Sequence, residues 1–188
     1  MLPLALIGAT FAVAGPSYSV FNRSTSSAAN AWTAGAVTLQ NNSSGTNAQI
    51  GSALFGISGL QPGASASKCV AVTSTSSVTT GVSLYVSNVS PVGAGNLPSY
   101  VSMSVTMGTG SSGTNGDCTG YTPTSTLATN VHLDSLPTTY AGGVTPWAPS
   151  VGTDTRVFKF TYTVDMTVPN TLQNSTAGAT FVWEAQSS

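Results

Sequence analysis

The chain has 188 residues, a length that suits one domain with its own hydrophobic core. Only 5% of the residues are charged and the formal net charge is -1, which excludes a field strong enough to attract nucleic acid or an anionic membrane surface. Serine and threonine, with 28 residues of each, must therefore supply most of the polar surface.

The first predicted element is the apolar segment Leu2–Gly15 (LPLALIGATFAVAG). At about 14 residues it is shorter than the roughly 20 that a helix needs to cross a bilayer, and it has the length of a signal-peptide core. No basic residue precedes it, so we expect residues 1–20 to be a signal peptide that is incomplete at its N-terminus, cleaved between Ala14 and Phe21. The alternative is a buried first strand or core helix. Export would leave no stable membrane span after processing and would place the protein in the extracellular matrix or at the cell surface.

Segments rich in Val, Thr, Tyr and Phe follow, separated by clusters of Gly, Pro, Ser and Asn, and this pattern predicts β-strands joined by turns. No long amphipathic helix is evident. We therefore expect an all-β fold, an antiparallel two-sheet sandwich or jelly roll, built as one domain over residues 21–188. The predicted strands are Trp32–Leu39, Lys68–Thr75, Val82–Val89, Tyr100–Met107, Arg156–Val168 and Ala177–Ala185.

The tract 108–120 (GTGSSGTNGDCTG) is rich in Gly and Ser and predicts a mobile loop, which Cys118 can tie down. Cys69 and Cys118 are the only two cysteines, and in an oxidising compartment we expect them to form a disulfide. Across their separation of 49 positions, the bond would stabilise the fold by ~4 kcal/mol in the loop-entropy model. Two buried free thiols are the alternative, because spacing alone does not fix the geometry.

Few residues are available for catalysis. His132 is the only histidine, so a two-histidine zinc site cannot be built. His132 and Asp134 would share one side of a strand, but no Gly-x-Ser-x-Gly elbow selects a serine to complete a triad. We therefore predict a protein that is not an enzyme and has no catalytic, metal-binding or cofactor-binding residues. The acidic residues are Asp117, Asp134, Asp154, Asp165 and Glu184.

The sequence disfavours three further kinds of site. Asp154 and Asp165 lack the dense Asp/Asn loop of a calcium site, and pairing with Arg156 or Lys159 is the simpler interpretation. An isopeptide bond between Lys159 and Glu184 is disfavoured, because strand alternation directs the lysine away from the core. A sugar-binding platform could be formed by Trp32, Trp147 and Trp183. Large aromatic residues in a small sandwich are more often core or rim residues, and we favour that interpretation.

Three stretches carry recognisable motifs, in this order: SYSVFNRS from Ser17 leading to WTAGAVTL over Trp32–Leu39; LQPG over Leu60–Gly63 followed by Lys68–Val89; and Phe158–Gln186, which contains NTLQ over Asn170–Gln173 and ends in AGATFVWEAQ. Together they resemble the camelysin/TasA family of secreted biofilm-matrix proteins, whose signal peptides are removed by a dedicated signal peptidase. The middle of the chain, Ser90–Gly152, has no clear counterpart in that pattern.

The resemblance implies a jelly-roll fold and subunits that polymerise by donor-strand exchange, each mature N-terminus completing the sheet of a neighbour. The donor would begin at Phe21, Asn22 and Arg23, and the partners would be other copies of the same chain. We therefore expect a secreted structural subunit of an extracellular matrix or fibre that assembles non-covalently. Two alternatives stay open, a secreted hydrolase or peptidase and a surface adhesin or carbohydrate-binding module.

Overall fold

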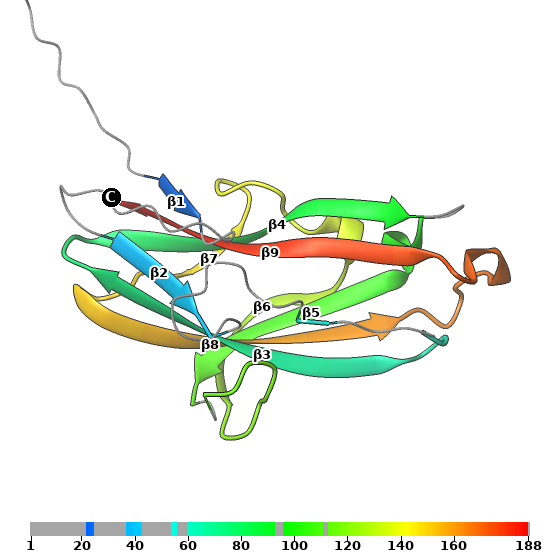
Figure 1. Ribbon diagram of the computed structural model, residues 1–188, viewed down its shortest axis with the longest axis horizontal. Coiled ribbons are helices and arrows are strands. Elements are labelled where there is room, and N and C mark those ends of the chain that lie inside the picture. Colours follow the sequence, from blue (N-terminus) through cyan, green and yellow to red (C-terminus); the bar gives the residue numbers. More distant parts are fainter. Residues whose placement is uncertain are drawn as a thin grey trace, which may run out of the picture.

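The computed structural model describes residues 22–24, 37–42, 54–55, 60–92, 96–110 and 113–187, and the expected signal peptide lies outside them. Within these ranges the chain forms nine β-strands and three short 3-10 helices (Figure 1). None of the helices in this part of the chain is long and apolar enough to cross a membrane. The strands are β1 (Asn22–Ser24), β2 (Val37–Asn41), β3 (Ser65–Ser76), β4 (Thr80–Val92), β5 (Val101–Thr109), β6 (Thr122–His132), β7 (Val144–Trp147), β8 (Gly152–Val164) and β9 (Thr176–Ser187), and the 3-10 helices are η1 (Leu97–Tyr100), η2 (Leu133–Ser135) and η3 (Asn170–Leu172).

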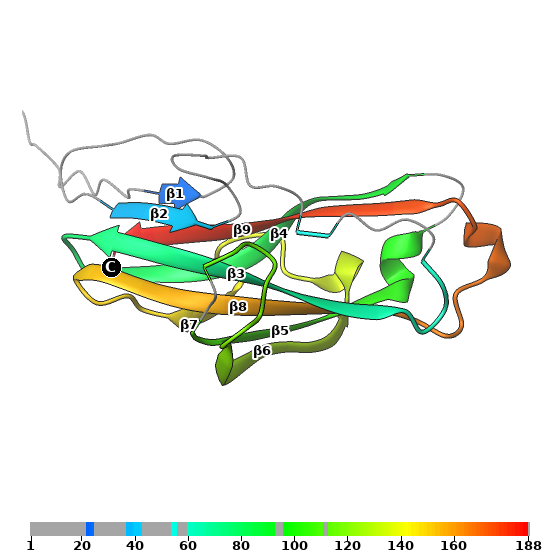
Figure 2. The same cartoon turned by 60° about the horizontal axis from the view of Figure 1, so that its bottom comes forward.

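The strands form two antiparallel sheets that pack face to face (Figures 1 and 2). The four-stranded sheet has the order β1-β9-β4-β7, and the five-stranded sheet has the order β2-β3-β8-β5-β6. Early strands therefore pair with late ones in a nested way: β1 with β9, β3 with β8, β4 with β7 and β5 with β6. This nesting is the pattern of a jelly roll, so the expected all-β, two-sheet fold is confirmed.

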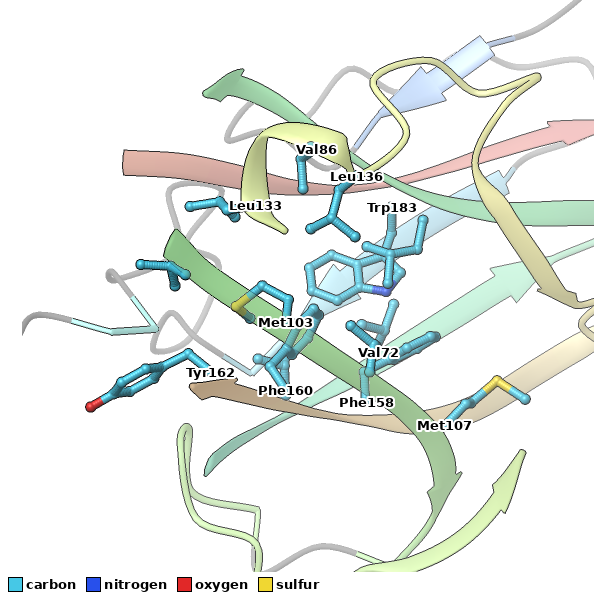
Figure 3. Close-up of a cluster of buried hydrophobic side chains, with 14 of the residues drawn as sticks. Val72, Val86, Met103, Met107, Leu133, Leu136, Phe158, Phe160, Tyr162 and Trp183 are labelled. Atoms are coloured by element: carbon cyan, nitrogen blue, oxygen red, sulfur yellow. The ribbon is translucent and has the colours of Figure 1, made fainter. Parts of the chain in front are cut away.

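Alternation along β8 builds the centre of the core. Phe158 and Phe160 point between the sheets and are 1% and 0% exposed. Their rings lie 5.4 and 5.9 Å, centroid to centroid, from that of Trp183 on β9 (Figure 3). Burial of each such side chain contributes roughly 1.5–3 kcal/mol, so aromatic residues of β8 and β9 hold the two sheets together.

Five predicted strands are found with shifted ends as β3, β4, β5, β8 and β9, and the end of a sixth, Trp32–Leu39, overlaps β2. The strand predicted over Arg156–Val168 is wrong at its end. β8 stops at Val164, although the backbone N–H of Asp165 still donates to Tyr100 O at 2.9 Å, the next position in register with β5.

Two strands, β6 and β7, were not predicted. β6 lies at the edge of the five-stranded sheet, most of its side chains are exposed or half-buried, and its register against β5 shifts in three places. A strand in that position needs no apolar alternation, so its sequence lacks the usual signal. The glycine-rich tract also begins later than expected, because Gly108 belongs to β5. A Cβ there would lie 2.0 Å from Thr122 O, so glycine permits the close approach of β6.

Candidate assembly edges

One side of the sandwich is formed by the strands β1 and β9 of one sheet and β2 and β3 of the other. Figure 2 shows β1 and β2 side by side above β9 and β3. Both β1 and β2 are short, so each covers only part of the strand next to it. The remaining length of β9 and of β3 decides what this side of the molecule can bind, since an uncovered strand edge presents backbone N–H and C=O groups.

The edge of β9 is covered only near its C-terminal end. β1 pairs antiparallel with the stretch Glu184–Gln186, in the register Asn22 to Gln186 and Ser24 to Glu184. On its other side β9 pairs with β4 along most of its length. Among the described residues, no strand pairs with the β1 side of β9 from Thr176 to Val182. We call this stretch, residues 176–182, the bare edge.

The bare edge carries two kinds of side chain. Those that point toward the core are half-buried and apolar, namely Ala177, Ala179 and Phe181. Of those that alternate with them, Thr176, Gly178 and Thr180 are exposed to solvent, whereas Val182 is buried. A strand that added here would satisfy the backbone groups of β9 and cover the small apolar side chains at the margin of the core.

The part of β9 that holds β1 contains a buried acid. Glu184 is 8% exposed, and it accepts hydrogen bonds from Tyr85 Oη at 2.8 Å and from Gln186 Nε2 at 3.0 Å. Burial, the hydrogen bond to Glu184 and its negative charge together raise the pKa of Tyr85 to about 12. Tyr85 therefore stays a neutral donor at physiological pH and fixes the carboxylate beside the β1 pairing.

The edge of β3 is covered by three successive groups. β2 pairs with Val72–Ser76. Asn42, the next residue after β2, then takes both backbone groups of Ala71: its N–H donates to Ala71 O at 3.0 Å and its Oδ1 accepts from Ala71 N–H at 2.9 Å. Beyond that, Gly116 pairs with Cys69, donating to Cys69 O at 2.9 Å and accepting from Cys69 N–H at 3.5 Å. The edge of β3 is thus capped from Ser76 back to Cys69.

The cap at Cys69 belongs to the connection between β5 and β6, whose described part crosses β8 and reaches β3 (Figure 2). A disulfide joins Cys69 to Cys118 in this connection, as predicted. Gly116 has φ +83°, a conformation that favours glycine, and a Cβ there would meet Lys68 Cδ at 3.2 Å. The expected mobile loop is therefore bonded to the sheet over residues 113–118, which we call the capping loop.

The predicted donor strand begins at Phe21, Asn22 and Arg23, and the structure describes the last two of these residues. Asn22 and Arg23 form β1 together with Ser24 and pair with β9 of their own chain. Phe21 lies outside the described residues. The pairing places the predicted donor segment on the same edge that is bare further along, a juxtaposition that sequence reasoning could not supply because it depends on the sheet order.

His132 and Asp134 do not share a strand face, so that expectation was wrong. β6 ends at His132, and Asp134 lies in η2. His132 Nε2 instead lies 3.3 Å from Asp165 Oδ2, and the Ser102 hydroxyl donates to Asp165 Oδ1 at 3.3 Å. The carboxylate thus lies between serine and histidine, whereas triad catalysis needs the histidine between the other two.

Asp134 is held by polar side chains of η1 and its neighbours. The Ser99 hydroxyl donates to this carboxylate and holds its pKa below the ordinary value. Hydrogen bonds from Asn96 and Ser135 act in the same direction, and together they outweigh the opposite effect of partial burial. Asp134 therefore stays ionised and fastens the turn after β6 to η1.

The other polar candidates have structural partners. Asp154 accepts from Arg156 Nη1 at 2.8 Å, as expected, and also from Trp147 Nε1 at 3.0 Å. Trp147 and Trp183 are each 4% exposed, which confirms the core interpretation for these two, while Trp32 lies outside the described residues.

Lys159 and Glu184 cannot form an isopeptide bond in this arrangement. Lys159 alternates with the core residues of β8, and Glu184 alternates with Trp183 of β9. The two side chains therefore lie on the outer faces of different sheets. In the part of the chain that the structure covers, no three His, Cys, Asp or Glu side chains converge in a group that could hold a metal ion.

Comparison with known proteins finds no family model that matches the chain and no match among curated proteins.

Proposed function

We propose that this protein is a secreted structural subunit of an extracellular matrix or fibre, and that it assembles non-covalently by donor-strand exchange between copies. The observation that carries the proposal is the bare edge, residues 176–182, which lies along the same side of β9 as the three-residue pairing with β1.

The exchange would use the edge that β1 already occupies. In one subunit, Asn22–Ser24 pairs with Glu184–Gln186 of its own β9. The N-terminal segment of a neighbour can make the same backbone hydrogen bonds and can continue along the bare edge. Each added residue pair would satisfy strand N–H and C=O groups that otherwise face water, and alternate donor side chains would cover Ala177 and Ala179.

The surface composition supports close packing of copies. With 5% charged residues and a net charge of -1, neighbouring subunits repel each other little, and hydroxyl groups can form hydrogen bonds across their contacts. Nothing in this arrangement requires catalysis, and the functional requirement is a stable sheet with one edge left open for addition.

Electron microscopy of the protein processed at its natural N-terminus tests the proposal, with the N-terminus mapped by mass spectrometry. We expect filaments above a threshold concentration. Monomers that persist at high concentration, with the mature N-terminus present, would contradict it. Hydrolytic activity that survives purification and is lost in His132→Ala would instead support the enzyme alternative. Specific glycan binding by the purified, folded protein would support the adhesin alternative.

A further inference from the structure

The capping loop occupies backbone groups that a docking strand would need. In an antiparallel ladder, the N–H and C=O of one residue point to the same side, and successive residues alternate. Cys69 and Ala71 both direct these groups away from β8, toward Gly116 and Asn42 respectively. Thr73, two residues further along β3 than Ala71, has the same orientation and lies opposite Gln40 of β2. The capping loop therefore extends the line of partners that β2 begins.

The disulfide is placed where it fixes this cap. Cys69 supplies both the backbone groups that pair with Gly116 and the sulfur that binds Cys118, two residues further along the loop. Its side chain is 1% exposed, so the bond lies beneath the loop. Asn42 adds a second attachment, because its Nδ2 donates to Gly113 O at 3.4 Å. Loop and strand edge are thus joined at both ends of the capping loop.

We propose that the capping loop, fixed by the Cys69–Cys118 disulfide, prevents a β-strand of a second copy of this chain from adding to β3, and so restricts strand addition to β9. The protection of β3 stands on the contacts described above, while the restriction to β9 rests on the proposed function. A subunit with both edges open would add copies sideways as well as end to end, and the cap suppresses the sideways contact.

Two full-length variants without the disulfide test the proposal against simple loss of stability. Cys69→Ser with Cys118→Ser releases the loop and leaves the N–H of residue 69 available. Cys69→Pro with Cys118→Ser also releases the loop, but proline has no N–H, and at this position the N–H faces away from β8. Both variants lose the same cross-link, so they differ mainly in the edge that they expose.

Sedimentation equilibrium would measure self-association, with circular dichroism as the check of folding. We expect the serine variant to associate at least about tenfold more tightly than the wild type, and the proline variant to stay near the wild type. Equal association of the two variants, or a folded serine variant that associates no more than the wild type, would overturn the proposal. If the serine variant associates and the wild type forms no filaments, the proposed function and the restriction to β9 fail, while the protection of β3 by the capping loop stands.

A second pair of variants keeps the disulfide and covers the case in which its loss prevents folding. Gly116→Val and Gly120→Val place the same branched residue at glycines with φ +83° and φ +80°. Both substitutions place a branched residue at a strained positive φ, but only Gly116 pairs with β3 and lies against Lys68. We expect increased self-association and faster amide exchange at Cys69 in Gly116→Val alone. The same behaviour in both variants, or in neither, would count against the cap.

Discussion

β3 and β9 lie on the same side of the sandwich, and each has a short strand that covers one end of it. Beyond β2, the edge of β3 continues to be satisfied by Asn42 and then by Gly116. Beyond β1, the edge of β9 pairs with no strand among the described residues over Thr176–Val182. The jelly-roll order places both strands at this side, so topology alone does not distinguish them. The difference comes from a few local contacts, and it makes one edge suitable for addition and the other unsuitable.

The edge of β6, at the opposite end of the five-stranded sheet, is protected in another way. β6 contains Pro123, which cannot donate to an added strand, and its pairing with β5 shifts register in three places. Such irregularity twists an edge and disfavours the straight pairing that strand addition needs. The bare edge of β9 contains no proline, and its pairing with β4 shifts register in one place, between Ser87 and Ser90, rather than three.

The largest expected effect concerns the bare edge itself. Ala179→Lys would place a charge among the half-buried apolar side chains that an added strand must cover, so we expect filament formation to be lost. Thr180→Lys adds the same charge to the exposed face one residue away, and filaments should persist. Light scattering and electron microscopy would measure both. Filaments of normal length in Ala179→Lys would show that the edge of β9 is not used.

The next effect concerns the cross-link at β3. Loss of the disulfide in Cys69→Ser with Cys118→Ser should lower the free energy of unfolding by ~4 kcal/mol, because the unfolded chain regains the entropy of a 49-residue loop. Urea denaturation of wild type and variant would give the difference. A change below about 1 kcal/mol would mean that the cross-link contributes little beyond positioning the capping loop.

A smaller effect is expected at Asn42. Asn42→Ala removes the Oδ1 acceptor from Ala71 N–H, and the loss of one hydrogen bond at a partly buried edge costs about 1 kcal/mol. Hydrogen exchange of the Ala71 N–H should become faster. Exchange of the Val72 N–H, which points toward β8, should not change. Faster exchange along all of β3 would instead indicate that the strand itself is loosened.

The smallest effect at neutral pH concerns the β1 end of β9. The pKa of Tyr85 in the folded protein is raised to about 12, above its ordinary 10. The contribution of neutral Tyr85 to the free energy of unfolding is therefore complete below pH 10 and is lost as the pH rises from 10 toward 12. Tyr85→Phe cannot ionise, so its stability should fall less over that interval. Denaturation at a series of pH values would compare the two, and parallel curves would contradict the assignment.

The sequence predicts the parts of this fold that alternation marks. The strongest strand was expected to bury Phe158 and Phe160, and it does, because central strands need one apolar face. β6 was missed because a Ser/Thr-rich edge strand carries no such signal. The disulfide followed from two cysteines and an expected oxidising compartment.

The assembly edges were not predictable in the same way. The pairing of Gly116 with Cys69 is made by backbone groups, which leave no pattern in the sequence beyond a glycine-rich loop. The bare edge of β9 is a consequence of strand order, and its Thr and Ala residues alternate as those of an ordinary strand would. Donor residues Asn22 and Arg23 were proposed from the resemblance, and the structure adds the strand with which they pair.

Cross-linking of the β1 pairing in assembled material tests the central claim most directly. Asn22→Cys with Gln186→Cys joins residues that face each other in the ladder between β1 and β9. Asn22→Cys with Thr176→Cys is the control, because Asn22 lies beside the C-terminal end of β9 and Thr176 is at its N-terminal end. If copies exchange strands, oxidised filaments of the first variant should give a ladder of covalent oligomers on a denaturing, non-reducing gel. Filaments that yield only cross-linked monomers would contradict donor-strand exchange.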